Sequence, residues 1–201
     1  MKIGIIADIH ADYAGLVEVL RRLDDEHRVD TILCAGDLTG YGKEPNPVIE
    51  LVRQRAIPTA KGNHDSPSKD ISPENAAYLR ALPLSFRLQV DNQRLYMCHA
   101  RPGIPFIGLN PQTMSREDLD ALLDSADADI MIVGHTHAPV LVQTTRGMLF
   151  NPGSVYCRGT EGTSLSYGIL HAPEMRLELF DLLQPFSSSL VPPDTYIHSL
   201  T

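Results

Sequence analysis

Metal-ligating side chains follow short apolar runs at five places along this chain of 201 residues. Each run has the length of a single strand, and most of the intervening segments are long enough to hold a helix. Side chains that follow successive strands meet at one edge of a sheet, however far apart they lie in the sequence. The ordered series therefore favours an α/β fold and has the layout of a two-metal hydrolase. The five clusters are Asp8-Ile9-His10, Gly36-Asp37, Gly62-Asn63-His64-Asp65, His99 and Gly134-His135-Thr136-His137.

The composition is that of one globular domain and excludes some partners. With 43% apolar residues the chain can bury a sizeable core. The net charge is -8 and no run of basic residues is longer than Arg21-Arg22, so we expect no binding to duplex nucleic acid. Two divalent ions would make the site itself electropositive, so the overall charge does not identify the substrate.

The N-terminus and the cysteines indicate a cytoplasmic protein. The apolar stretch at residues 3–7 is too short for a signal peptide or a membrane span, so we expect no membrane partner. The three cysteines, Cys34, Cys98 and Cys157, are odd in number and far apart. We expect them to be structural free thiols.

Hydrophobic periodicity predicts strands and helices in alternation, followed by a region richer in strands. A single domain is expected over residues 1–183, with a C-terminal tail, residues 184–201, either docked or disordered. The expected elements are strands at 3–7, 31–35 and 57–60; helices at 13–26, 48–55 and 72–82; a hairpin at 86–98; a helix from Ser115 to 123; a strand at 130–133; and short strands over 140–182.

The first and last clusters each place two ligand-type side chains two residues apart. Asp8 and His10 follow an expected strand, and alternate residues of an extended chain face the same side, so both can reach one ion. The alternative for this pair is an N-cap aspartate beside an incidental histidine. His135 and His137 also follow an apolar run, and two histidines in that setting favour a metal over core packing.

The middle clusters are individually less specific. Turn chemistry explains the glycine and asparagine of residues 62–65 but not the histidine. Asp37 can bridge two ions, although Gly-Asp is also a common turn. His99 alone would more often be a satisfied buried histidine. Five of the eight histidines follow strand-like runs, which makes chance clustering a poor explanation.

In this order the motifs resemble those of the calcineurin-like metallophosphoesterase superfamily, over about residues 1–155. The chain is most similar to the small single-domain bacterial and archaeal phosphodiesterases of that superfamily. The resemblance implies a four-layer α/β/β/α sandwich of two mixed β-sheets flanked by helices. It implies one metal bound by Asp8, His10, Asp37 and His137, and a second bound by Asp37, Asn63, His99 and His135.

The resemblance also implies a mechanism. A hydroxide bridging two divalent metals would attack phosphorus in line with the leaving group. His64 would lie near the leaving oxygen, and Asp65 would orient its imidazole. Asn63 would also contact the substrate. The segment Asn151-Pro152-Gly153-Ser154 matches a further family motif, which we interpret as structural support. Manganese is the favoured metal, and Fe, Zn, Ni and Co suit the same ligands.

Departures from the family pattern narrow the substrate. Phosphoprotein phosphatases of the superfamily have Asp-Arg-Gly near the bridging aspartate, whereas this chain has Asp37-Leu38-Thr39-Gly40. Arg101 either clamps a phosphate oxygen or forms an ordinary ion pair. Residues 103–113 either form a wall of the substrate pocket, contact another subunit or fold onto the core. Tyr41 either stacks on a base or caps the sheet edge.

The leading hypothesis is a metal-dependent phosphodiesterase for a small phosphoester. The alternatives are a nucleotide pyrophosphohydrolase or phosphomonoesterase with the same site, and a non-catalytic scaffold for protein interaction. Every position expected to bind metal holds a competent residue, which favours catalysis. A homo-oligomer is left open.

Overall fold

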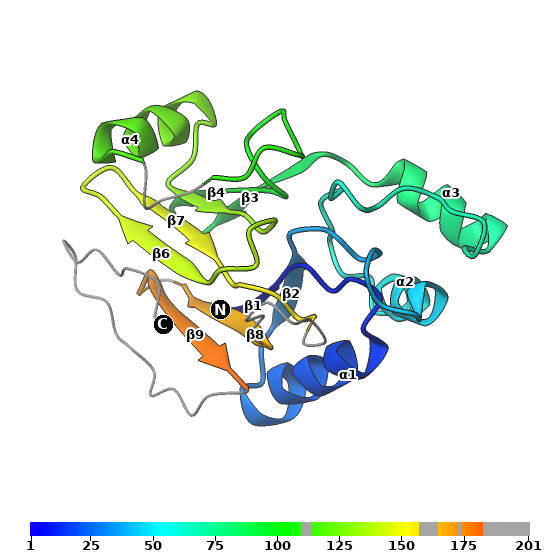
Figure 1. Cartoon of the computed structure of the whole chain (residues 1–201). Coiled ribbons are helices and arrows are strands. Elements are labelled where there is room, and N and C mark those ends of the chain that lie inside the picture. The colour runs from blue at the N-terminus through cyan, green and yellow to red at the C-terminus, as the bar shows by residue number, and fades with distance from the viewer. Residues whose placement is uncertain (110–113, 157–164, 173, 183–201) are drawn as a thin grey trace.

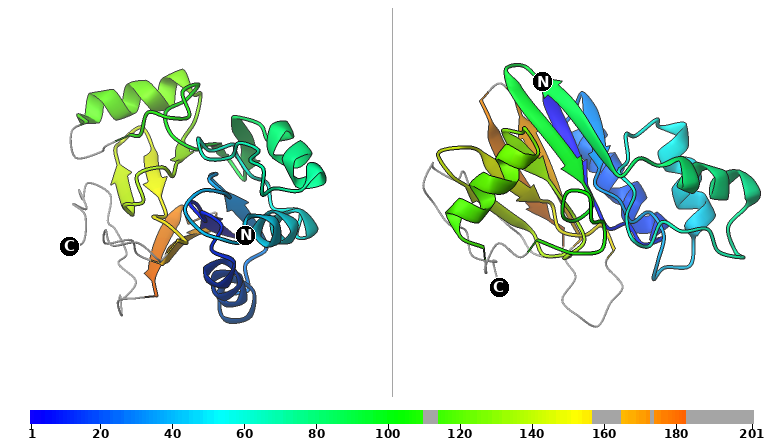
Figure 2. Two further views of the ribbon diagram at one scale, coloured as in Figure 1. Left: turned by 45° about the vertical axis from the view of Figure 1, so that its right-hand side comes forward. Right: turned by 90° about the horizontal axis from the view of Figure 1, so that it is seen from above.

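Two β-sheets pack face to face between helices in this chain (Figures 1 and 2). The structure is a computed structural model that describes residues 1–109, 114–156, 165–172 and 174–182. Helices α1 and α2 cover the outer face of one sheet, and α4 covers the outer face of the other (Figure 1). The expected α/β/β/α sandwich is confirmed.

The elements are, in chain order, β1 (Lys2–Ile6), α1 (Tyr13–Arg21), the π-helical turn η1 (Arg22–Glu26), β2 (Thr31–Cys34), α2 (Pro45–Gln54), α3 (Pro73–Ala81), β3 (Ser85–Val90), β4 (Gln93–Cys98), α4 (Arg116–Ser125), β5 (Ile130–Ile132), β6 (Val140–Gln143), β7 (Met148–Asn151), β8 (Ser166–His171) and β9 (Arg176–Asp181).

Both sheets are mixed, and their parallel strands position the site. The first sheet has the order β2-β1-β8-β9, with β1 parallel to β2 and antiparallel to β8. The second has the order β3-β4-β5-β7-β6, in which β4, β5 and β7 are parallel. Four of the ligand clusters follow β1, β2, β4 and β5. These clusters converge because they follow the carboxyl ends of two parallel pairs, one in each sheet.

The caps of the helices follow from the sequence. Asp12 accepts a hydrogen bond from the backbone N–H of Gly15 at the start of α1, with a distance of 3.0 Å. Ser115 and Asp118 form a capping box at the start of α4. Ser72 caps α3 by accepting from the backbone N–H of Asn75. Each cap satisfies N–H groups that have no partner inside the helix.

The apolar core has three parts, one for each interface between layers. Leu16 of α1 belongs to the part between the first sheet and its helices. Ile5 and Ile132 come from opposite sheets and lie in the part between them. Leu123 of α4 packs on the outer face of the second sheet. The apolar residues that recur with period 2 in the strands and with period 3.6 in the helices therefore face these three parts of the core.

One expected element is wrong, and one begins earlier than expected. Residues 57–60 form no strand: only one bridge, from Thr59 to Cys34, joins them to β2. The segment leaves the sheet at once, because the N–H of Lys61 donates to the carbonyl of Pro83 instead. Helix α2 starts at Pro45 rather than at residue 48, since prolines fit the first turn, where N–H groups lack intrahelical partners.

The other expected elements are confirmed within one to three residues at their ends. Cys34 and Cys98 are buried free thiols, as expected, and burial raises the pKa of both. Cys157 and the tail lie outside the described residues. Within the described part of the chain, no helix combines the length and the apolar character that crossing a membrane requires.

The two sheets fit together where a phenylalanine faces a glycine. Phe150 of β7 is 1% exposed, and a Cβ built on Gly168 of β8 would lie 2.3 Å from its Cε1 atom. We expect Gly168→Ala to destabilise the protein by about 1–3 kcal/mol, because the ring must move within a close-packed core. Chemical denaturation measures this change. Adding Phe150→Leu should restore part of the loss, and simple additivity of the two changes would contradict the proposed contact.

Candidate metal centre

The backbone turns sharply at the ends of the strands that lead into the site. Positive φ angles occur at Asp8 (54°), His10 (47°), Asp37 (57°), His135 (72°) and His137 (56°). This left-handed region is uncommon for residues other than glycine, although aspartate and histidine adopt it more readily than most. The expectation that Asp8 and His10 face one side because the chain is extended is therefore wrong. They converge because the chain coils immediately after β1.

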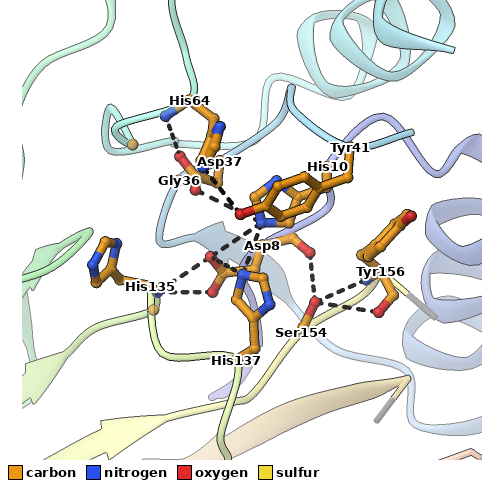
Figure 3. A network of polar contacts seen from close by, with 12 residues as sticks. Asp8, His10, Gly36, Asp37, Tyr41, His64, His135, His137, Ser154 and Tyr156 are labelled. Atoms are coloured by element: carbon orange, nitrogen blue, oxygen red, sulfur yellow. Dashed lines mark hydrogen bonds and ion pairs between the residues drawn. The ribbon is translucent and has the colours of Figure 1, made fainter. Parts of the chain in front are cut away.

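One group of ligand atoms joins β1 to the loop after β5. The Nε2 atoms of His10 and His137 lie 2.8 Å apart, and Asp8 Oδ1 lies 3.4 Å from His137 Nε2 and 3.8 Å from His10 Nε2. One ligand atom from each of these three residues lies within 4.8 Å of the ligand atoms of the other two. Atoms this close together can bind a single metal ion. Figure 3 shows these residues meeting around Asp8.

A second group adjoins the first. His99 Nε2 lies 3.3 Å from Asp37 Oδ2 and 3.0 Å from Asn63 Oδ1. His135 Nδ1 lies 2.7 Å from the same asparagine oxygen. Asp8, Asp37 and His99 also form a compact set of ligand atoms. The oxygen and nitrogen donors of this group suit a borderline divalent ion.

Asp37 stands between the two groups. Its Oδ2 atom lies 3.7 Å from His10 Nε2 and 3.3 Å from His99 Nε2. Its other oxygen accepts a hydrogen bond from the backbone N–H of His64 at 2.9 Å, so that Oδ2 is left toward the histidines. The geometry therefore fits the expectation that this carboxylate bridges two ions.

Backbone carbonyls set the orientation of two imidazoles. His10 Nδ1 is 3.1 Å from the carbonyl oxygen of Thr39, and His99 Nδ1 is 2.8 Å from that of Ala35. An N–H must occupy Nδ1 to make these bonds, so Nε2 is the atom of each ring that is left to ligate a metal. The sequence could not reveal these partners, because they are main-chain carbonyls, which every residue carries.

The protonation states respond to burial and to the carboxylates. Burial lowers the pKa of His10 to about 4, opposed in part by the charges of Asp37 and Asp8, so this ring is neutral and able to ligate. Burial also lowers the pKa of His99, but the hydrogen bond to Asp37 and the charges of Asp37 and Asp8 together exceed it and raise the pKa of His99 to about 9. The same interaction holds the pKa of Asp37 below its usual range despite burial. A bound cation would replace the proton on His99.

The described hydrogen bonds of Asp65 are to the main chain. Its buried carboxylate accepts hydrogen bonds from the backbone N–H groups of Gly62 (2.9 Å), Asp37 (3.0 Å), Leu38 (2.8 Å) and Thr39 (3.2 Å). Among the described contacts of Asp65, none reaches the imidazole of His64. Asp65 therefore joins the loop after β2 to the turn that holds Asn63, and its expected role in orienting His64 stays a prediction.

The imidazole of His64 has a different neighbour. Its Nε2 atom lies 3.3 Å from the hydroxyl of Tyr41, while its backbone carbonyl accepts from Thr39 Oγ1 at 2.6 Å. Figure 3 shows Tyr41 lying across His10, and the two ring centroids are 4.4 Å apart. The sequence drew attention to Tyr41 as a residue of the glycine-rich loop but could not show that it reaches two histidines.

The segment 151–154 supports the site as expected. Asn151 donates from Nδ2 to the carbonyl of Gly134 at 2.7 Å, and Ser154 donates from Oγ to the carbonyl of Asp8 at 2.8 Å. The backbone N–H of His135 donates to both oxygens of Asp8. Gly134 is required there, because a Cβ would lie 2.7 Å from Asp8 Oδ2. These bonds tie together the loops after β1, β5 and β7.

The loop after Arg101 lies beside the second group. Arg101 itself is exposed. Hydrogen bonds with Ser115 hold the pKa of Asp118 on α4 below its usual range, and the charge of Arg101 adds to this effect. Its part in substrate binding stays a prediction. A Cβ on Gly108 would lie 2.8 Å from His135 Cδ2, so the loop borders the site, and Leu109 is buried while Phe106 is 67% exposed. Residues 110–113 lie outside the described structure.

Comparison with known families agrees with this geometry. A family model for the calcineurin-like phosphoesterase superfamily domain matches residues 1–175, and the chain belongs to this superfamily. Phosphodiesterase YfcE of Escherichia coli K12 is 28% identical over 184 residues, which cover 85% of this chain and 87% of YfcE. The resemblance found in the sequence is confirmed.

Solved structures share the fold. A metallophosphoesterase from Sphaerobacter thermophilus has a TM-score of 0.72 at 24% identity, with 90% of this chain and 87% of that chain covered. Vps29 from Entamoeba histolytica, solved as a complex with zinc, has a TM-score of 0.66 at 22% identity, with 95% and 98% covered. At these identities the likeness establishes the architecture alone.

The role of Asp65 can be tested by replacing one of its oxygens. Asp65→Asn should lower the metal content of the protein and reduce the free energy of unfolding by about 2–3 kcal/mol. The new amide NH₂ would face backbone N–H groups, which would then lack an acceptor. Metal analysis and chemical denaturation measure the two effects, with the exposed Asp70→Asn as a matched control. A variant with full metal content and slow turnover would instead favour a role in orienting His64.

Proposed function

We propose that this protein is a two-metal phosphoesterase that prefers small phosphodiesters. The observation that supports it most is the position of Asp37 Oδ2, within 3.7 Å of one histidine from each ligand group. Membership of the superfamily supports phosphoester hydrolysis. The name of the relative YfcE, a phosphodiesterase, supports the preference for diesters.

The donors present suit two ions. Asp8, His10 and His137 would hold one; Asn63, His99 and His135 would hold the other; and Asp37 would contact both. When bound, two divalent ions supply Lewis-acid activation of water and neutralise charge that develops on the phosphoryl oxygens. Manganese is our choice among the ions that suit these ligands, which also include Fe, Zn, Ni and Co.

His64 is the residue we assign to the leaving group. It is half-buried, and its main chain is bound on both sides, by Asp37 Oδ1 and by the hydroxyl of Thr39. Its ring is therefore held at the edge of the ligand groups, 5.2 Å between centroids from that of His10. A proton held at its Nε2 atom can pass to the departing oxygen.

The space beside His64 fits a substrate with a second ester arm. A hollow of about 440 Å³ is bordered by His64, Ser66, Ser68 and Lys43, with Pro45 and Ile71 among its apolar lining. Such a hollow can receive the group beyond the reacting phosphate. A phosphoprotein chain is not favoured, since the Asp-Arg-Gly element of those phosphatases is absent here.

Different losses are expected from the bridging residue and from the proposed acid. Asp37→Ala should lower the metal content of both ligand groups, because Asp37 Oδ2 would contact the ion in each group. His64→Ala should keep nearly full metal content and lower kcat by about 10²–10⁴-fold, as for loss of a general acid. Elemental analysis and steady-state kinetics measure both. Loss of metal from His64→Ala would refute its assigned role.

The preferred ester can be tested on chelator-treated protein to which single metals are returned. We expect bis-p-nitrophenyl phosphate to be cleaved faster than p-nitrophenyl phosphate, with Mn²⁺ giving the highest rate. Release of p-nitrophenolate measures both reactions. Preference for the monoester would favour the phosphomonoesterase alternative. No turnover with any metal by well-folded, metal-binding protein would favour the non-catalytic scaffold.

A further inference from the structure

A second hollow opens beside the metal centre, next to His10. Its volume is about 230 Å³, less than the roughly 300–1,000 Å³ of sites that enclose a drug-sized molecule. It therefore has room for one ring system rather than for a whole dinucleotide. It is separate from the hollow at His64, although Gly42 and Lys43 border both. The lining residues are Ala11, Asp12, Tyr41, Gly42, Lys43, Glu44 and Tyr156.

Two tyrosine rings form the aromatic walls of this hollow. The ring centroids of Tyr41 and Tyr156 are 5.9 Å apart, and each ring also contacts His10, at 4.4 Å and 5.9 Å. Tyr41 is 59% exposed, so a large part of its ring is available to a ligand. In Figure 3 both tyrosines lie on one side of Asp8, and His135 lies on the other.

The main chain that carries each ring is held by close contacts. A Cβ on Gly40 would lie 2.3 Å from His10 Nδ1, and one on Gly42 would lie 2.3 Å from the carbonyl oxygen of His10. Only glycine allows the loop to approach so closely, and this approach sets Tyr41 against His10. The backbone N–H of Tyr156 lies 3.0 Å from Ser154 Oγ and 3.1 Å from the carbonyl oxygen of Asp8. A wall that is already ordered loses little entropy when a ligand binds.

We propose that this hollow is a subsite for the base of a nucleotide substrate, so that the phosphodiesters hydrolysed are esters of nucleosides. The inference rests on the proposed function and adds the substrate class. Aromatic side chains stack on the π-faces of all bases with little preference among them. Lys43 and Glu44 at the rim offer one donor and one acceptor for the polar edges of a base. A lipid or alkyl group would use neither charge.

The test compares two ligands that differ only in the base. AMP and ribose 5-phosphate share the sugar and the phosphate, so the ratio of their Kd values, measured by calorimetry on metal-loaded protein, isolates the contribution of the base. We expect AMP to bind about tenfold more tightly. Equal affinity for the two ligands in the natural protein would overturn the proposal without any variant.

Variants at Tyr41 then locate the contact. Tyr41→Ala should reduce the affinity ratio to within about twofold of unity, whereas Tyr41→Phe keeps the ring and should keep the ratio. Because Tyr41 is exposed, its replacement should leave folding intact. An unchanged ratio in Tyr41→Ala would show that the base binds elsewhere and would also overturn the proposal.

Kinetics separate this inference from the proposed function. Thymidine 5′-monophosphate p-nitrophenyl ester and methyl p-nitrophenyl phosphate share a leaving group and differ in the retained group. We expect a lower KM for the thymidine ester, lost in Tyr41→Ala with a smaller change in kcat. Turnover of both esters with equal KM would support the phosphodiesterase and refute the subsite. Tighter binding of AMP than of ribose 5-phosphate by a protein that turns over neither ester would support the subsite and refute the phosphodiesterase.

Discussion

The buried carboxylate of Asp65 is the contact on which the rest of the site depends. It accepts from four backbone N–H groups, three in the loop after β2 and one at Gly62. Burial and the nearby charge of Asp37 raise its pKa to about 6, and the N–H groups of Gly62 and Thr39 oppose this. The interaction fixes two loops relative to each other. Through them it positions Asp37, which contacts both ligand groups, and the turn that presents Asn63 and His64.

Much of the architecture was accessible from the sequence because its signals are local. Strand lengths, helix periodicity and caps such as Ser72 and the Ser115–Asp118 box each depend on a few neighbouring residues. The expected strand at 57–60 failed because pairing depends on a distant partner. After one bridge, the N–H of Lys61 turns to Pro83, and no short sequence window contains that contact.

The sequence could predict which residues meet at the candidate site but not the backbone conformation that brings them together. The residues expected to bind metal do come together, yet Asp8 and His10 do so through left-handed turns rather than through the alternation of an extended strand. The described partners of Asp65 could not be read from the sequence, since they are main-chain N–H groups, which every residue but proline carries. Tyr41 shows the same limit: its sequence neighbours are glycines, and its spatial neighbours are His10 and His64.

The place of β1 within its sheet has a consequence for how the chain must mature. This strand precedes β2 and β8 in the sequence but lies between them, and the backbone nitrogen of Met1 donates to the carbonyl of Ala172. During synthesis from the N-terminus, one edge of β1 therefore stays unpaired until β8 has been made. An apolar strand with an open edge is a template for pairing with other chains. Nascent or truncated chains that end before β8 would accordingly be the species most in need of a chaperone.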